Sequence, residues 1–165
     1  GFDIWLLRPE RPADPPVHLV HSAASESDPR ISPDGRWLAY ASNESGRSEI
    51  YVVSLPDART KYQVTTEGGR HPIWTRGGRE LFYMTSAYAV AAVAVTPGET
   101  LTFLAPVTLF PQPRPNWGTG ADQALFDVTA DGDRIVVLVP ENQGSQTLVV
   151  VSDWLSELGA EVARP

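Results

Sequence analysis

Residues 31–42 read "ISPDGRWLAYAS", which is a short apolar start, a turn centred on Gly35 and an apolar run after the turn. Two later segments repeat this plan without a gap, and they read "WTRGGRELFYMT" at 74–85 and "VTADGDRIVVLV" at 128–139. Glycine suits such a turn because positive φ carries no steric cost for it. The repetition predicts three copies of one β-hairpin, and therefore a repeat protein.

The residues around the turns predict how each hairpin is built. Asp34 and Asp131 precede the turn glycine in the first and third copies, where a carboxylate can accept hydrogen bonds from nearby backbone. The middle copy has Gly77 there, so we expect its turn to lack this cap. The apolar runs after the turns do not alternate with polar residues, which is typical of strands covered on both faces.

Further strands complete a repeating unit. We expect third strands at 48–55, 88–95 and 146–154, and fourth strands at 60–65 and 105–110. The N-terminal segments "FDIWLLRP" and "PVHLV" look like the third and fourth strands of an earlier unit. With 15 prolines and 13 glycines in 165 residues, long helices are disfavoured and an all-β fold is expected.

The spacing of the turn glycines is typical of propeller blades. Gly35 and Gly78 are 43 residues apart, a period found in four-stranded blades. Gly78 and Gly132 are 54 residues apart, and the excess falls in the Pro/Gly-rich segment 110–120, which we expect to be an inserted loop.

Composition excludes several classes of protein. The chain has 20 acidic and 13 basic residues, and the cations are scattered singly, so a nucleic-acid partner is not expected. No apolar stretch is long enough to span a membrane, and the N-terminus "GFDIWLLRPE" lacks the pattern of a signal peptide, so we expect no direct membrane insertion. The absence of cysteine leaves the redox compartment open.

The run "DPRISPDGRWLAYASNESGRSEIYVVSL" at 28–55 resembles the repeat of TolB-like β-propellers, the WD40-like (PD40) group. The longer pattern through "LVVVSDWLSEL" is similar to the C-terminal part of propellers fused to bacterial serine/threonine kinases. The resemblance implies four-stranded antiparallel blades and a six-bladed ring, of which this chain would form about half, or three blades. It also favours a periplasmic or other extracytoplasmic location, with the cytoplasm left open. The residues that carry the resemblance are Asp28, Pro29, Ser32, Pro33, Asp34, Gly35, Ile50, Tyr51 and Val52.

We expect a single partial propeller domain over residues 1–165, with one blade incomplete at each end. Its predicted parts are the end of a blade at 1–26, full blades at 27–68 and 69–110, an inserted loop at 111–120, a last blade without its outer strand at 121–152, and a C-terminal tail at 153–165.

An unfinished ring would expose strand edges and apolar blade flanks, which favour association. We therefore expect two copies to form a homodimer that closes the ring. Two alternatives remain open at this point: the other half of the propeller was removed by proteolysis, or the segment from Ser152 to Glu161 folds over the exposed side.

No motif predicts catalysis, a cofactor or a metal. The chain has no Gly-x-Ser-x-Gly elbow and no phosphate-binding glycine loop. His18, His21 and His71 do not follow a zinc spacing, and "SDPRISPDGR" does not follow a calcium loop.

The five tryptophans are candidates for contact residues. Trp5, Trp37 and Trp74 lie in strand patterns, where we expect them to fill the space between blades. Trp117 lies in the Pro/Gly-rich insert and is a candidate contact residue.

Propeller geometry predicts one binding face, because loops that enter the first strand of each blade lie at the same end as loops joining the second and third strands. Asn43–Arg47 and Glu141–Gln143 would lie there too. The predicted binding residues are Asp28, Arg30, Arg70, His71, Tyr88, Trp117 and Asp122.

The leading hypothesis is a non-catalytic module that binds a protein or peptide partner or acts in a sensor. The alternatives are a propeller that gates a serine peptidase of the prolyl-oligopeptidase type, and a purely structural half-propeller that assembles with itself.

Overall fold

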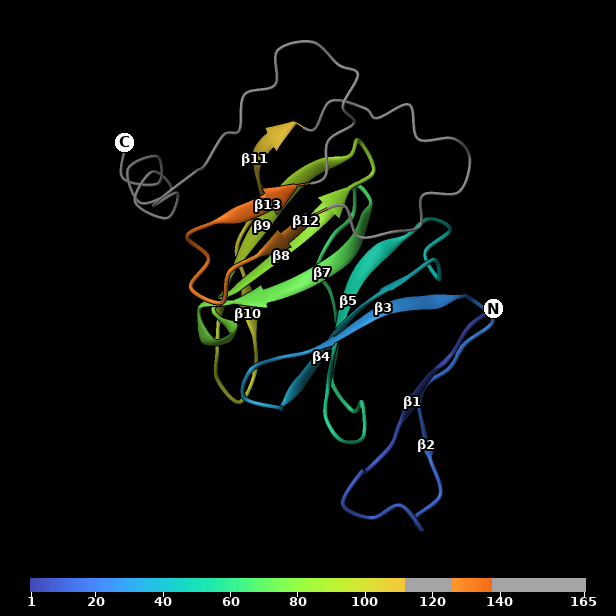
Figure 1. The fold of residues 1–165 in the computed structure, drawn as a ribbon. Coiled ribbons are helices and arrows are strands. Elements are labelled where there is room, and N and C mark those ends of the chain that lie inside the picture. Colours follow the sequence, from blue (N-terminus) through green and yellow to red (C-terminus); the bar gives the residue numbers. More distant parts are fainter. Residues whose placement is uncertain (112–125, 138–165) are drawn as a thin grey trace.

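The computed structural model describes residues 1–111 and 126–137, which form successive antiparallel β-sheets that do not close into a ring (Figure 1). The predicted all-β class is therefore confirmed. Within the described part of the chain, no helix is long and apolar enough to cross a membrane.

The first two sheets cover the N-terminal third of the chain. One is the pair of β1 (Ile4–Leu6) and β2 (Val17–Val20). The other is a four-stranded meander in the order β3-β4-β5-β6. Its strands are β3 (Glu26–Ile31), β4 (Trp37–Ser42), β5 (Glu49–Ser54) and β6 (Lys61–Gln63).

The third sheet repeats the meander with a divided outer edge. Its strands are β7 (Gly69–Thr75), β8 (Glu80–Thr85), β9 (Ala89–Thr96), β10 (Thr102–Phe103) and β11 (Val107–Pro111). Both β10 and β11 pair with β9, whereas the sequence predicts one fourth strand at 105–110. The eight-residue length of β9 allows this, because β10 pairs with its last residues and β11 with its first. The fourth sheet is the pair of β12 (Phe126–Val128) and β13 (Ile135–Val137).

The middle strands are buried on both faces. In β4, Leu38 and Tyr40 pack against the β1–β2 sheet, while Ala39 and its alternate neighbours pack against the third sheet. In β8, Leu81 faces the second sheet and Phe82 faces β12 and β13. The prediction of strands covered on both faces is confirmed for these strands, and each sheet supplies one wall of its neighbour's core.

The three turns follow the predicted plan. Gly35 and Gly132 have φ of 72° and 74°. Asp34 Oδ1 accepts hydrogen bonds from Arg36 N at 3.1 Å and from the Ser32 hydroxyl at 2.6 Å. Asp131 likewise accepts from Asp133 N and from the Thr129 hydroxyl.

The middle turn is a 3-10 turn, η1 (Arg76–Gly78), without a side-chain cap. The Thr75 hydroxyl donates to the buried Glu80 carboxylate at 3.0 Å instead. The expectation that Gly77 removes the cap is therefore confirmed.

Two packing predictions are wrong at the ends of the described stack. Trp5 is 49% exposed and stacks on the imidazole of His18, with 4.1 Å between ring centroids, rather than filling a core. Val136, in the middle of β13, is 68% exposed. Both residues lie in two-stranded sheets, and the described residues place a neighbouring sheet on only one face of each. Trp37 and Trp74 are buried as predicted.

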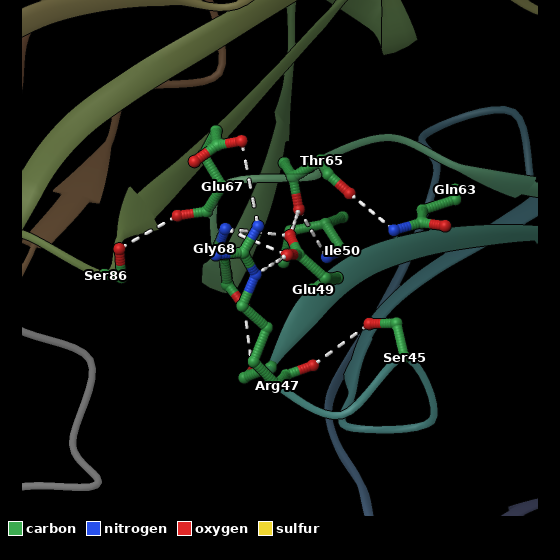
Figure 2. Close-up of polar contacts among 11 residues, drawn as sticks. Ser45, Arg47, Glu49, Ile50, Gln63, Thr65, Glu67, Gly68 and Ser86 are labelled. Carbon is green, nitrogen blue, oxygen red and sulfur yellow. Dashed lines mark hydrogen bonds and ion pairs between the residues drawn. The ribbon is translucent and has the colours of Figure 1, made fainter.

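A buried polar cluster around Glu49 joins the second and third sheets, and we call it the Glu49 cluster (Figure 2). The Glu49 side chain is 1% exposed and forms an ion pair with Arg47 at 2.6 Å. Its carboxylate accepts hydrogen bonds from the Thr65 hydroxyl at 2.5 Å and from Gly68 N at 3.0 Å. Thr65 also accepts a hydrogen bond from Ile50 N at 2.9 Å. The cluster therefore fixes the connection that leads from β6 into β7.

The start of β7 is fixed to the segment before β5 by two hydrogen bonds between Ser48 and Gly69. Gly69 N donates to Ser48 O, and the Ser48 hydroxyl donates to Gly69 O, both at 2.9 Å. A Cβ at Gly69 would lie 2.8 Å from Ile50 Cγ1 and 2.9 Å from Thr65 Oγ1, so the position requires glycine. Residues that follow Gly69 are consequently placed relative to β5 with little freedom.

We predict that Glu49→Ala destabilises the chain by about 3 kcal/mol, because it leaves the Thr65 hydroxyl and Gly68 N–H buried without their acceptor. Urea unfolding followed by tryptophan fluorescence measures this change. Glu67→Ala is the matched control, since it removes the same charge from an exposed side chain beside the cluster, and should shift the free energy of unfolding by under about 0.5 kcal/mol. Equal effects of the two substitutions would contradict the role given to Glu49.

Candidate functional site

The first strands of the two complete meanders, β3 and β7, share an irregular start. Asp28 and His71 have φ of 54° and 53°, in the left-handed region that non-glycine residues seldom adopt. The pairing of each strand with its neighbour shifts register at the same place, between Ser27 and Arg30 in β3 and between Arg70 and Ile73 in β7. Left-handed backbone costs about 1 kcal/mol or more at each such residue, so the surrounding packing must hold it.

This irregularity brings Asp28 and His71 together across the two sheets. His71 Nδ1 lies 3.0 Å from Asp28 Oδ1, and His71 N donates to Asp28 Oδ2 at 3.4 Å. The imidazole is 4% exposed, and within the described residues neither ring nitrogen has a partner in hydrogen-bonding geometry. The close approach of Nδ1 and Oδ1 is therefore an ion-pair contact when the imidazole is protonated.

The surroundings of Asp28 set its charge. Burial raises the pKa of the Asp28 carboxyl, but the contacts with His71 outweigh burial and hold the pKa below its usual value. The hydroxyl of Ser27, which donates to Asp28 Oδ2 at 3.3 Å, adds to this lowering. Asp28 is therefore ionised at neutral pH and supplies a fixed negative charge beside the imidazole.

Two clefts meet at His71. The first, of about 280 Å³, we call the serine-lined cleft. The second, of about 440 Å³, lies where β3 and β7 approach β12, and we call it the Phe126 cleft. The serine-lined cleft is lined by Phe2, Ser25, Ser27, Asp28, Asn43, Ser48, Arg70 and His71. The Phe126 cleft is lined by Arg30, His71, Ile73, Phe126 and Asp127.

The structure brings together four of the predicted binding residues, Asp28, Arg30, Arg70 and His71, around these clefts. Tyr88 lies in the turn between β8 and β9 and packs, partly buried, against the Phe82 core, so it lines neither cleft. Trp117, Asp122 and Glu141–Gln143 lie outside the described residues.

Several residues that line the clefts were not predicted from the sequence. For two of them, Ile73 and Asp127, the repeat pattern could have indicated the position. When the copies are aligned on their turn glycines, Arg30, Ile73 and Asp127 occupy one equivalent position, two residues before Ser32, Thr75 and Thr129. All three line the Phe126 cleft. The first strands of three successive sheets thus contribute one residue each to a shared cleft.

This convergence of first strands is the arrangement expected near the axis of a propeller. No protein-family model matches the chain, and no curated protein matches it. Among solved structures, the chain is similar to "putative TolB from Agrobacterium tumefaciens", with a TM-score of 0.51 and 20% sequence identity. The fold is part of a β-propeller. The match covers 65% of this chain and 42% of the Agrobacterium protein, so the chain spans under half the length of that structure.

Metal ligands do not cluster in the described residues, where no group of three or more His, Asp or Glu side chains is placed to hold an ion. The chemistry that the clefts offer comes from two arginines, a buried imidazole with its carboxylate, and apolar walls. Such a set suits the binding of polar groups beside apolar ones.

We predict that the Asp28–His71 contact makes the free energy of unfolding decrease as the pH falls into the acidic range. A carboxyl whose pKa is lowered by folding adds stability that is fully present above its unfolded pKa of about 3.8 and is lost as the pH falls through the folded value. Asp28→Asn should therefore lower stability by about 1 kcal/mol at neutral pH and flatten its decline below about pH 4. Urea midpoints measured in steps from pH 7 to pH 3 test this.

The variant His71→Gln removes the main cause of the lowered pKa, so it should flatten the same part of the curve. In the double variant the two effects should not add, because both remove one contact. Additive losses, or an unchanged decline in Asp28→Asn, would contradict a coupling between these side chains.

Proposed function

We propose that this chain is a non-catalytic recognition module that binds a protein or peptide partner at the face formed by the serine-lined cleft and the Phe126 cleft. The observation that carries the proposal is the convergence of Arg30, Ile73 and Asp127, one from each of three sheets, next to the Asp28–His71 contact. Binding sites in proteins are commonly concave, with apolar walls and a few polar groups that fix orientation.

The chemistry of the face supports recognition rather than catalysis. A serine nucleophile needs a base within hydrogen-bonding reach. The Ser27 hydroxyl donates to Asp28, and within the described residues no hydroxyl hydrogen-bonds to either ring nitrogen of His71. The proposal therefore favours a binding module over a chain that itself carries a hydrolase centre.

The backbone at the face is well held, which favours binding without large rearrangement. The Glu49 cluster fixes the start of β7, and Trp74 Nε1 donates to Arg30 O at 3.1 Å from the neighbouring sheet. A preorganised face loses little conformational entropy when a partner binds.

We predict that peptides selected on the immobilised full chain from a displayed random library bind at this face. Arg70→Glu and Asp127→Lys reverse one charge beside each cleft, and at least one of them should weaken the selected peptides about tenfold or more. Arg59→Glu is the matched control, because Arg59 is exposed in the loop between β5 and β6. Fluorescence anisotropy of labelled peptides gives the affinities, and equal binding to all three variants would contradict the proposal.

We also propose that the propeller is completed by a second copy of the chain. The β1–β2 sheet and the residues that flank β1 expose large apolar side chains. Exposed apolar groups of this kind are typical of an interface. Trp5 and Val17 belong to the two strands, and Phe2 and Leu7 flank β1.

Multi-angle light scattering should therefore give a mass that rises from one chain to two with concentration. Leu7→Glu should shift the equilibrium toward the monomer, because it places a charge in the proposed contact. Leu104→Glu, which changes a similarly exposed leucine that follows β10, should not. A strictly monomeric mass at all concentrations would overturn the self-association proposal and leave the binding face untouched.

A further inference from the structure

We propose that the Phe126 cleft binds a single carboxylate group that is flanked by an apolar side chain, as at the C-terminus of a peptide. This inference rests on the proposed recognition function and narrows it to one class of ligand. Its basis is the combination of Arg30, the buried imidazole of His71 and the apolar wall of Ile73 and Phe126 in one cleft.

The buried imidazole points to a ligand because one of its nitrogens, Nε2, has no polar partner among the described residues. His71 is 4% exposed, and among the described residues both ring nitrogens lack a hydrogen bond. A buried polar group without a partner is destabilising, so such groups are normally satisfied. The Asp28 carboxylate lies 3.0 Å from Nδ1, so Nε2 is the ring nitrogen left without a hydrogen bond or ion pair among the described residues. A hydrogen on Nε2 makes this atom a donor for an anionic ligand.

Arg30 supplies the second donor. Its Nη1 donates to Pro29 O at 2.9 Å, and the planar guanidinium has further N–H groups on its other edge. Guanidinium groups bind carboxylates through two parallel hydrogen bonds. The bond from Trp74 Nε1 to Arg30 O holds the backbone beneath this side chain.

The remaining lining residues restrict the ligand. Phe126 is buried and Ile73 is half-buried, so an apolar group beside the carboxylate would contact both. Asp127 is exposed, and its Oδ1 accepts a hydrogen bond from Val128 N at 2.8 Å. Its negative charge disfavours a second anionic group, so the cleft suits a monoanion better than a phosphate dianion.

The charged groups near the imidazole are those of both first strands and of β12. They are Asp28 and Arg30 from β3, Arg70 from β7 and Asp127 from β12. Of the two arginines, Arg30 lines the Phe126 cleft and Arg70 lines the serine-lined cleft.

The test is a titration of the full chain, labelled with ¹⁵N, with N-acetyl-phenylalanine and with N-acetyl-phenylalaninamide, which differ only in the carboxylate. We expect the acid to bind with a Kd on the order of 1 mM and to shift the backbone amides of Arg30, His71 and Ile73. The amide should bind at least about tenfold more weakly, because it cannot form charge-assisted hydrogen bonds.

Variants locate the contact. Arg30→Ala should weaken binding of the acid about 10- to 100-fold, and Arg30→Lys should restore only part of it, since a lysine cannot form the paired hydrogen bonds. Arg59→Ala removes the same charge from an exposed residue that lines neither cleft, and it should leave the affinity unchanged. Native-like spectra of each variant establish that it is folded.

The inference would be overturned if the acid and the amide bound equally, or if Arg30→Ala and Arg59→Ala had equal effects. It would also be overturned if the amide chemical shifts changed only at other residues. These results are distinct from failure of the recognition function. If displayed peptides bind this face without needing a free carboxylate, the recognition function stands and the ligand class is wrong. If the acid binds the Phe126 cleft but no peptide is selected, the ligand class stands and the partner is a small molecule.

Discussion

The structure depends on the burial of its middle strands from both sides. The runs in β4, β5, β8 and β9 are almost wholly apolar and are covered on each face, so none of these sheets could be stable in water without its neighbours. Adjacent sheets must therefore stack, and the right-handed twist of each sheet makes successive sheets turn about a common side. The first strands, β3, β7 and β12, approach one another as a consequence. The candidate site is a product of this stacking, because its residues come from separate sheets and no single sheet contains it.

Much of this architecture could be predicted from sequence, because hairpin turns and two-sided burial are local properties. The turn glycines, the caps made by Asp34 and Asp131 and the missing cap at Gly77 all follow from residues within a few positions of one another. The β-meander order follows from the short connections between consecutive strands, which make them antiparallel neighbours. The exposure of Trp5 could not be predicted in this way, because it depends on whether another sheet lies against β1 and not on the residues around Trp5.

The candidate site was only partly accessible to sequence reasoning. Asp28 and His71 could be placed at one end of their sheets, but their contact depends on left-handed backbone and register shifts that have no strong local signature. The Glu49 cluster was not predicted from the sequence. Glutamate at the start of an apolar strand suggests a solvent-facing residue, and only the loop that returns through Thr65 and Gly68 turns it into the acceptor of a buried network. Long-range polar contacts of this kind are set by the final packing and not by periodicity.

The stacking also places side chains of different copies next to one another where the first strands meet. Ser32, Thr75 and Thr129 each make contacts within their own sheet, so they can stay alike without interfering with one another. Arg30, Ile73 and Asp127 share a cleft, and three arginines there would place like charges together at a cost that grows with burial.

The same reasoning applies to Asp28 and His71. Two aspartates about 3 Å apart could not both be ionised, whereas an aspartate and a histidine attract each other. Divergence between copies at these positions therefore avoids contacts between like charges, and it gives the shared cleft a mixture of charge and apolar surface.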